Sequence, residues 1–263
     1  MSTLQLDKVD AAPWGNSLLQ NINFTAYPGD VLALAGPNGA GKTSLLKLLA
    51  GDFSQTAGQL TFGDRPLLEW SALERARRLA FLPQMSLLNF PYTVEEVVML
   101  GRIPHSSGQH TDAQIVEQAL QLTDITSLRH RLYTHLSGGE KQRAQLARIF
   151  AQISGETSLE GRQLLLDEPT SALDMAHQQQ VMLAVQELAG RGCAVVLALH
   201  DLNLAASVAD LILVLNQGQQ VALGTPDQIL TSALFQQVFG VRVSISRHPL
   251  DDHPMITVLR ETP

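Results

Sequence analysis

The chain has 263 residues, of which 45% are hydrophobic, and this suits one large α/β domain or two small ones. Its longest apolar runs, such as Val195–Leu199 and Leu211–Leu215, are too short to span a bilayer, and the N-terminus lacks the basic start and apolar core of a signal peptide, so we expect a cytosolic protein. A net charge of −7 with no block rich in Lys and Arg argues against a nucleic-acid partner.

The N-terminal region is expected to form antiparallel strands with one solvated face. Residues 4–9 and parts of 20–26 alternate between apolar and polar side chains, which is typical of such strands. Trp14 lies between the two segments. Its ring could stack on an adenine ring or serve only as a packing residue, and both interpretations stay open.

A glycine-rich loop follows the next expected strand. The strand is the apolar run Val31–Ala35, and residues 44–50 after the loop have helical spacing. Glycines let backbone N–H groups wrap an anion, and a helix N-terminus adds unpaired donors and a partial positive charge. A strand, such a loop and a helix in this order predict a site for a nucleoside triphosphate, whereas a chance match would be an ordinary loop. The candidate binding residues are Gly36, Pro37, Asn38, Gly39, Ala40, Gly41, Lys42, Thr43 and Ser44.

Two side chains of this loop have specific expected roles. Lys42 would reach the β- and γ-phosphates, and the Thr43 hydroxyl would lie on a Mg²⁺ ion. A nucleoside triphosphate and Mg²⁺ are therefore the expected ligands.

The middle of the chain is expected to be a helical insertion. A buried strand at Leu79–Pro83 leads directly to Gln84, and residues 93–131 then take on helical apolar spacing, with Asp112 as an expected N-cap. The insertion ends at a second helix start, where a hydroxyl and glycines precede a helix that runs to about Ile153. This start is either a second anion-binding arrangement or an ordinary N-cap, and its residues are Ser137, Gly138 and Gly139.

Two acidic residues follow the next buried strand. The apolar run that ends in Asp167 and Glu168 is expected to be a central parallel strand with its charges at the carboxyl end, the same edge at which the glycine loop emerges. Asp167 is then placed to hold Mg²⁺, and Glu168 to accept a proton from an attacking water. His200 directly follows another buried strand, Ala194–Leu199, and is expected at this edge as well.

The remaining features carry less chemistry. The single cysteine, Cys193, is expected to be buried. Residues 240–260 alternate well enough for two short strands. His248 and His253 belong to this region, but their spacing matches no metal-binding pattern.

The order of these motifs resembles that of the ATP-binding-cassette ATPases over essentially the whole chain. The glycine loop, Gln84, Leu136–Glu140, Leu164–Glu168, Ser171–Asp174 and His200 correspond to the P-loop, Q-loop, signature, Walker B, D-loop and H-loop of that family. The segments 89–102 and 200–206 resemble those of type II importers for haem, iron–siderophores and cobalamin. The loop before the Walker B strand and residues 176–180 are similar to those of haem-importer ATPases.

The resemblance implies an α/β fold: a RecA-like P-loop NTPase core with a mixed, mainly parallel sheet, an N-terminal antiparallel β flap and an inserted α-helical subdomain. It places the core and flap at about 1–84 and 159–263, and the helical subdomain at about 85–158. It implies catalytic roles for Glu168, His200 and Gln84, with Gln84 also near the metal. It further implies a head-to-tail homodimer in which Ser137, Gly138, Gly139 and Asp174 act on the partner's ATP.

The implied function is to energise an importer from the cytoplasmic face of the bacterial inner membrane. The implied partners are a second copy of the chain, a permease dimer and, indirectly, a periplasmic substrate-binding protein. A siderophore or cobalamin importer, or a non-transport ATPase of the same family, remains an alternative.

Overall fold

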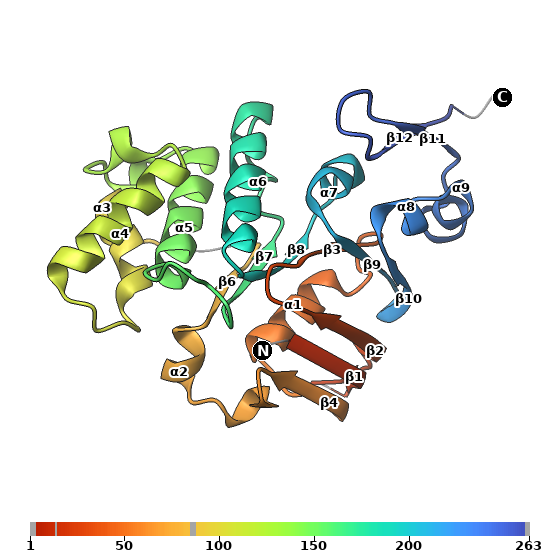
Figure 1. The fold of residues 1–263 in the computed structure, drawn as a ribbon, viewed down its shortest axis with the longest axis horizontal. Helices are drawn as coiled ribbons and strands as arrows, with labels where there is room; N and C mark the ends of the chain where they lie inside the picture. Colours follow the sequence, from red (N-terminus) through yellow and green to blue (C-terminus); the bar gives the residue numbers. More distant parts are fainter. Residues whose placement is uncertain (1–3, 14, 85–87, 261–263) are drawn as a thin grey trace.

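The computed structural model describes residues 4–13, 15–84 and 88–260. Figure 1 shows one large curved sheet with helices around it and a small C-terminal hairpin at the edge of the molecule. Trp14 lies outside the described residues, so its position relative to a nucleotide is not part of this structure. Within the described residues, no helix combines the length and hydropathy that a bilayer-spanning segment requires.

Ten of the described strands form the large sheet, in the order β5-β4-β1-β2-β10-β9-β3-β8-β7-β6. They are β1 (Leu4–Ala11), β2 (Leu19–Ala26), β3 (Val31–Ala35), β4 (Ala57–Phe62), β5 (Arg65–Pro66), β6 (Leu79–Leu82), β7 (Gln163–Asp167), β8 (Ala194–Ala198), β9 (Leu211–Asn216) and β10 (Gln219–Gly224). β11 (Val243–Arg247) and β12 (Pro254–Val258) form a separate hairpin.

The helices are α1 (Lys42–Ala50), α2 (Ala72–Ala76), α3 (Val94–Met99), α4 (Gln109–Leu122), α5 (Gly138–Ile153), α6 (Met175–Gly190), α7 (Leu202–Val208), α8 (Pro226–Ile229) and α9 (Ser232–Leu234). Short helical turns lie at Leu67–Glu69, Leu100–Arg102, Thr126–Leu128, Tyr133–His135 and Phe235–Phe239.

The parallel half of the sheet brings the chemically important chain segments to one edge. β9, β3, β8, β7 and β6 all pair in parallel, so their carboxyl ends lie together. β3 leads to the glycine loop, β7 ends at Asp167, β8 leads to His200 and β6 leads to Gln84. Ligands of open α/β sheets bind at this edge, so the topology itself collects the predicted site residues.

The sheet separates two hydrophobic cores. On one face, Leu45, Leu46, Leu48 and Leu49 of α1 pack with Leu32 and Leu34 and with the flap strands β1, β2 and β4. On the other face, Val31 and Ala33 pack with α5, α6 and the helices α3 and α4. The apolar side chains of β3 thus alternate between the two cores, which explains why the strand is apolar throughout.

The flap and the helical group lie on different sides of the core, as Figure 1 shows in red–orange and yellow–green. β1 pairs antiparallel with β2 and with β4, as the alternating sequence predicted. The expected fold class, a mainly parallel sheet with an N-terminal antiparallel flap and a helical insertion, is confirmed. The division of the chain near residues 85 and 158 stays a prediction.

The expected N-cap at Asp112 is wrong. α4 begins a turn earlier, after Gly108, which has a positive φ of 89°. The Asp112 carboxylate instead accepts hydrogen bonds from Arg102 Nε at 2.8 Å and from Ser107 Oγ at 2.7 Å. Because the Arg102 guanidinium is buried, it needs a charged partner, and Asp112 provides it.

Two further local predictions agree with the structure. The tail forms the two short strands of the β11–β12 hairpin. Cys193 is fully buried, and this burial raises the pKa of its thiol to about 12, so the sulfur is an inert packing group.

Candidate functional site

The glycine loop has the backbone shape that an anion cradle needs. Gly36, Gly39 and Gly41 have φ values of 143°, 76° and 108°, a region that L-amino acids with a Cβ rarely adopt. A Cβ at Gly36 would also lie 2.1 Å from the Leu215 carbonyl oxygen. The loop therefore requires glycine both for its conformation and for its close approach to β9.

Lys42 is held across the loop. Its ammonium donates hydrogen bonds to the carbonyl oxygens of Gly36 at 2.7 Å and Pro37 at 3.0 Å. Burial lowers the pKa of Lys42, while the nearby Glu168 and Asp167 carboxylates act in the opposite direction. The cation is thus pre-positioned inside the loop, next to two negative charges.

Asp167 is a buried acid with unmet polar atoms. Neither carboxylate oxygen has a hydrogen-bond partner among the described residues. Burial raises the pKa of Asp167; the adjacent Thr43 hydroxyl and Lys42 lower it, and Glu168 raises it further. Buried carboxylates without partners are rare and costly, and an oxygen-ligated cation is the group that would satisfy them. Asp167 and Thr43 therefore fit a Mg²⁺ site.

Glu168 is clamped between two side chains from other strand ends. Gln84 Nε2 donates to Oε2 at 2.9 Å, and His200 Nε2 lies 2.5 Å from Oε1. The Glu168 backbone has a φ of 52°, which is uncommon outside glycine and occurs often at functional sites. Its side chain is 13% exposed, whereas the His200 side chain is 52% exposed. The three side chains form a compact hydrogen-bonded group at the sheet edge.

These side chains line one cavity with the glycine loop. The cavity has a volume of about 660 Å³ and is lined by Ser17, Leu18, Asn38, Gly39, Ala40, Gly41, Lys42, Thr43, Ser44, Gln84, Glu168, His200, Gln217 and Gly218. Gly36 and Pro37 do not line the cavity, whereas the predicted loop residues from Asn38 to Ser44 line it together with Gln84, Glu168 and His200. Asp167 lies beneath them, 1% exposed.

Four lining residues were not predicted from the sequence. Ser17 and Leu18 precede β2, and Gln217 and Gly218 form the turn between β9 and β10. A Cβ at Gly218 would lie 2.3 Å from the Leu18 carbonyl oxygen, so the two segments are in contact. The proximity of Gly218 to Leu18 is a long-range contact that no local sequence pattern encodes.

The second helix start does not line this cavity. Ser137 caps α5: its backbone N–H donates to Glu140 at 2.7 Å, and its hydroxyl accepts from the Glu140 N–H at 3.4 Å. Asp174 caps α6 by accepting from the His177 N–H at 3.0 Å. Ser137, Gly138 and Asp174 are exposed, and Gly139 is half-buried. A Cβ at Gly139 would lie 2.9 Å from the Ala172 carbonyl oxygen, so the signature and D-loop segments lie against each other.

A larger cavity lies elsewhere and differs in chemistry. It has a volume of about 950 Å³ and lies between α4, residues 154–157 and α6. Of its described lining residues, Arg191 is the single cation, and Glu156 and Glu187 oppose it. A triphosphate needs donors and positive charge, so the smaller cavity at the glycine loop is the candidate nucleotide site.

The sheet order and the glycine loop are those of a P-loop NTPase core. A sequence model of the ABC transporter family matches residues 19–171. The hemin import ATP-binding protein HmuV of Pseudomonas putida is 48% identical over 254 residues, which are 96% of this chain and 98% of that protein. The HmuV protein of Pseudomonas entomophila is 51% identical over 92% of this chain and 94% of its own length. The chain belongs to the ABC transporter family.

A solved structure agrees with this assignment. A metal-chelate type ABC transporter in an inward-facing conformation matches with a TM-score of 0.80 and 28% identity, over 98% of each chain. The predicted family resemblance is therefore confirmed.

Proposed function

We propose that the chain is the ATP-hydrolysing subunit that energises a bacterial haem importer. The observation that carries the ATPase assignment is the Glu168 carboxylate, held between Gln84 and His200 beside the glycine loop. The haem assignment rests on the HmuV relatives, whose names state hemin import and whose alignments cover nearly the whole chain.

The glycine loop would bind the triphosphate through its backbone N–H groups. Lys42 would exchange its hydrogen bonds to the Gly36 and Pro37 carbonyls for bonds to the β- and γ-phosphates. Ser44 and the first turn of α1 add unpaired N–H groups and the positive end of the helix dipole. The residues Asn38, Gly39, Ala40 and Gly41 complete the cradle.

Thr43, Asp167 and Gln84 would hold Mg²⁺. The chemistry that Mg²⁺ supplies when bound is neutralisation of the charge on the phosphate oxygens. In this structure Gln84 is bonded to Glu168, so it must release that carboxylate to take part in metal binding.

Glu168 would act as the general base. Both of its oxygens are engaged, by Gln84 and by His200, so one bond must open before the carboxylate can accept a proton from water. Release of the Gln84 hydrogen bond would free Oε2 for this proton. His200 would meanwhile hold Oε1 and keep the carboxylate aimed at the γ-phosphate.

A second copy of the chain would complete the site. Ser137, Gly138, Gly139 and Asp174 lie outside the cavity of their own subunit and are mostly exposed, which supports a role on the partner's nucleotide. In a head-to-tail homodimer, each ATP would contact the glycine loop of one copy and the capped start of α5 of the other.

The expected partners follow from this role. The chain would bind a permease dimer at the cytoplasmic face of the inner membrane and receive substrate indirectly from a periplasmic binding protein. The metal-chelate type transporter at 28% identity keeps a siderophore or cobalamin importer as the second candidate. A non-transport ATPase of the same family is the remaining alternative.

Reconstitution with the permease tests the proposal. Proteoliposomes that contain the permease and this chain should take up haem when supplied with ATP, and Lys42→Ala should abolish uptake. Lys8→Ala is the matched control, because Lys8 is an exposed flap residue that is not among the residues lining the cavity. Transport of ferric siderophore or cobalamin in place of haem would overturn the haem assignment, and ATP hydrolysis that no permease affects would overturn the transport assignment.

A further inference from the structure

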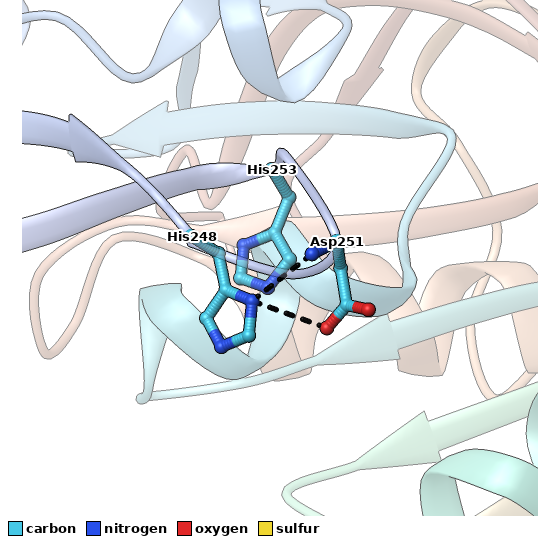
Figure 2. A group of neighbouring side chains, drawn as sticks. All are labelled: His248, Asp251 and His253. Atoms are coloured by element: carbon cyan, nitrogen blue, oxygen red, sulfur yellow. Dashed lines mark hydrogen bonds and ion pairs between the residues drawn. The ribbon is translucent and has the colours of Figure 1, made fainter.

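The C-terminal hairpin brings together three side chains that the sequence spacing did not connect. His248, Asp251 and His253 each offer one metal-ligating atom, and these atoms lie within 4.8 Å of one another. Figure 2 shows the three side chains converging at the turn between β11 and β12. We propose that they form a binding site for a divalent transition metal ion of the Zn²⁺ type, separate from the nucleotide site.

The hairpin backbone fixes the two histidines as neighbours. Arg247 and Pro254 are the last paired residues of the strands, and the His248 N–H donates to the His253 carbonyl at 2.9 Å. The imidazole rings stack with centroids 4.7 Å apart and an interplanar angle of 11°. Their five-residue separation in sequence therefore becomes direct contact across the turn.

Hydrogen bonds assign the lone pairs of the ligand atoms. His253 Nδ1 lies 3.2 Å from the Pro254 carbonyl oxygen, which can only accept, so Nδ1 carries the proton. The other ring nitrogen of His253 then has its lone pair, and Figure 2 shows it pointing toward His248 and Asp251. A carbonyl that fixes the tautomer and orientation of a histidine is the usual support of a metal ligand.

His248 and Asp251 face each other in an arrangement that a cation would complete. His248 Nδ1 accepts a hydrogen bond from the Asp251 N–H at 3.2 Å, so this nitrogen carries a lone pair. Asp251 Oδ2 lies 3.2 Å from the same nitrogen. One nitrogen cannot accept from the N–H and donate to the carboxylate at once. A cation that binds this lone pair would replace the Asp251 N–H as its partner and would lie next to the carboxylate.

The distances are close to those of a metal site. With ligands about 2.0–2.2 Å from a tetrahedral zinc ion, neighbouring ligand atoms are about 3.4 Å apart. The pair of His248 Nδ1 and Asp251 Oδ2 already meets this spacing at 3.2 Å. The three ligand atoms lie within 4.8 Å of one another, so the His253 and Asp251 side chains must move closer to bind one ion. The Asp251 side chain is 70% exposed.

The turn rests on a fixed base. Arg247 Nη1 binds Asp227 Oδ1 at 2.6 Å and the Asp252 carbonyl at 2.7 Å. The Asn203 side chain of α7 bonds to both the N–H and the carbonyl of Ile256 in β12, at 2.7 and 3.2 Å. The ligands are thus carried by a hairpin that is anchored at both strands, so the backbone keeps the three residues close together.

The ligand set also defines the class of ion. Two imidazole nitrogens and one carboxylate suit Zn²⁺, Fe²⁺, Co²⁺, Ni²⁺ or Cu²⁺, with water in the remaining positions. Mg²⁺ prefers an all-oxygen shell, so the Mg²⁺ that accompanies ATP would not compete.

Zinc titration of the nucleotide-free, chelator-treated chain by calorimetry tests the site in buffer that contains excess Mg²⁺. We expect a zinc-binding event that His248→Ala, His253→Ala and Asp251→Asn each weaken at least tenfold. Asp251→Asn changes one exposed side chain, so it keeps the test valid if a histidine variant fails to fold. Cobalt(II) added to the wild type should give visible absorption bands of a nitrogen- and oxygen-ligated ion, and these bands should be lost in Asp251→Asn.

Two control variants separate this site from general zinc binding. Asp252→Asn alters the neighbouring exposed acid, and His130→Ala removes an exposed histidine from the helical group. Both should bind zinc as the wild type does. Zinc bound at the His200–Glu168 pair would persist in all five variants. Wild-type chain without micromolar zinc affinity, or equal affinity in the three ligand variants and the controls, would overturn the proposal.

Discussion

Asp167→Asn should make the nucleotide-free protein more stable while it abolishes magnesium-dependent hydrolysis. Both carboxylate oxygens are buried and lack hydrogen bonds among the described residues, and burial raises the pKa of the acid. The folded state therefore pays for a charge that it does not satisfy when no cation is bound. Asparagine keeps the shape of the side chain and removes that charge.

The size of the effect follows from this unmet charge. A buried polar group without a partner costs about 1–3 kcal/mol. Lys42 and Thr43 offset part of this cost, and the asparagine amide keeps some of it. We expect a net gain of about 1–2 kcal/mol in the free energy of unfolding, or roughly 2–6 °C in melting temperature for a chain of this size.

The pH dependence has a definite sign. Because the pKa of Asp167 is raised in the folded state, folding favours the protonated acid. The penalty in the wild type is full at neutral pH and disappears as the pH falls through the folded and then the unfolded pKa. The advantage of Asp167→Asn should shrink on acidification.

Thermal unfolding measures both the stability gain and its pH dependence. The samples are wild type, Asp167→Asn and the exposed control Asp64→Asn, each with and without MgATP. MgATP should stabilise the wild type by mass action and the Asp167 variant much less. A lower melting temperature for nucleotide-free Asp167→Asn than for wild type would refute the reasoning, because it would mean that the carboxylate is already satisfied.

Two further predictions concern the loops. Gly36→Ala should lower the melting temperature by several degrees, because its Cβ would lie 2.1 Å from the Leu215 carbonyl oxygen. Gly138 has open space around it, so Gly138→Ala should leave the melting temperature unchanged. Equal melting temperatures of the two variants would contradict this reasoning. Ser137→Ala and Ser71→Ala each remove the N-cap of a capping box, so both should cost about 1 kcal/mol in unfolding experiments. Light scattering with MgATP should show that Ser137→Ala alone weakens a nucleotide-dependent dimer, and an equal effect of Ser71→Ala would remove the case for a contact in trans.

Much of the site could be predicted from the sequence because its parts are local. The glycines before α1 and the acids at the end of β7 are each encoded within a few residues, and parallel strands bring their carboxyl ends to one edge. Gln84 and His200 follow from the same rule. The N-cap of α5 at Ser137 could also be predicted from the sequence, because a cap depends on residues that are neighbours in the chain.

The failures are contacts that depend on the folded chain. Gly218 contacts Leu18, which precedes a different strand. Asp112 forms an ion pair with the buried Arg102 and therefore does not cap a helix as expected. The hairpin converts the unremarkable spacing of His248 and His253 into a ring stack. Each of these depends on pairing or burial between segments, which hydrophobic periodicity and local motifs do not report.

The most direct test of the account is phosphate release at saturating MgATP by wild type and Glu168→Gln. Glutamine keeps hydrogen-bonding contact with Gln84 and His200 but cannot take the proton from water, so turnover should fall by about 10²–10⁴-fold while ATP still binds. Glu69→Gln, an exposed glutamate remote from the cavity, should hydrolyse ATP at the wild-type rate. Turnover of Glu168→Gln within a few-fold of the wild type would contradict the role of Glu168 as the general base.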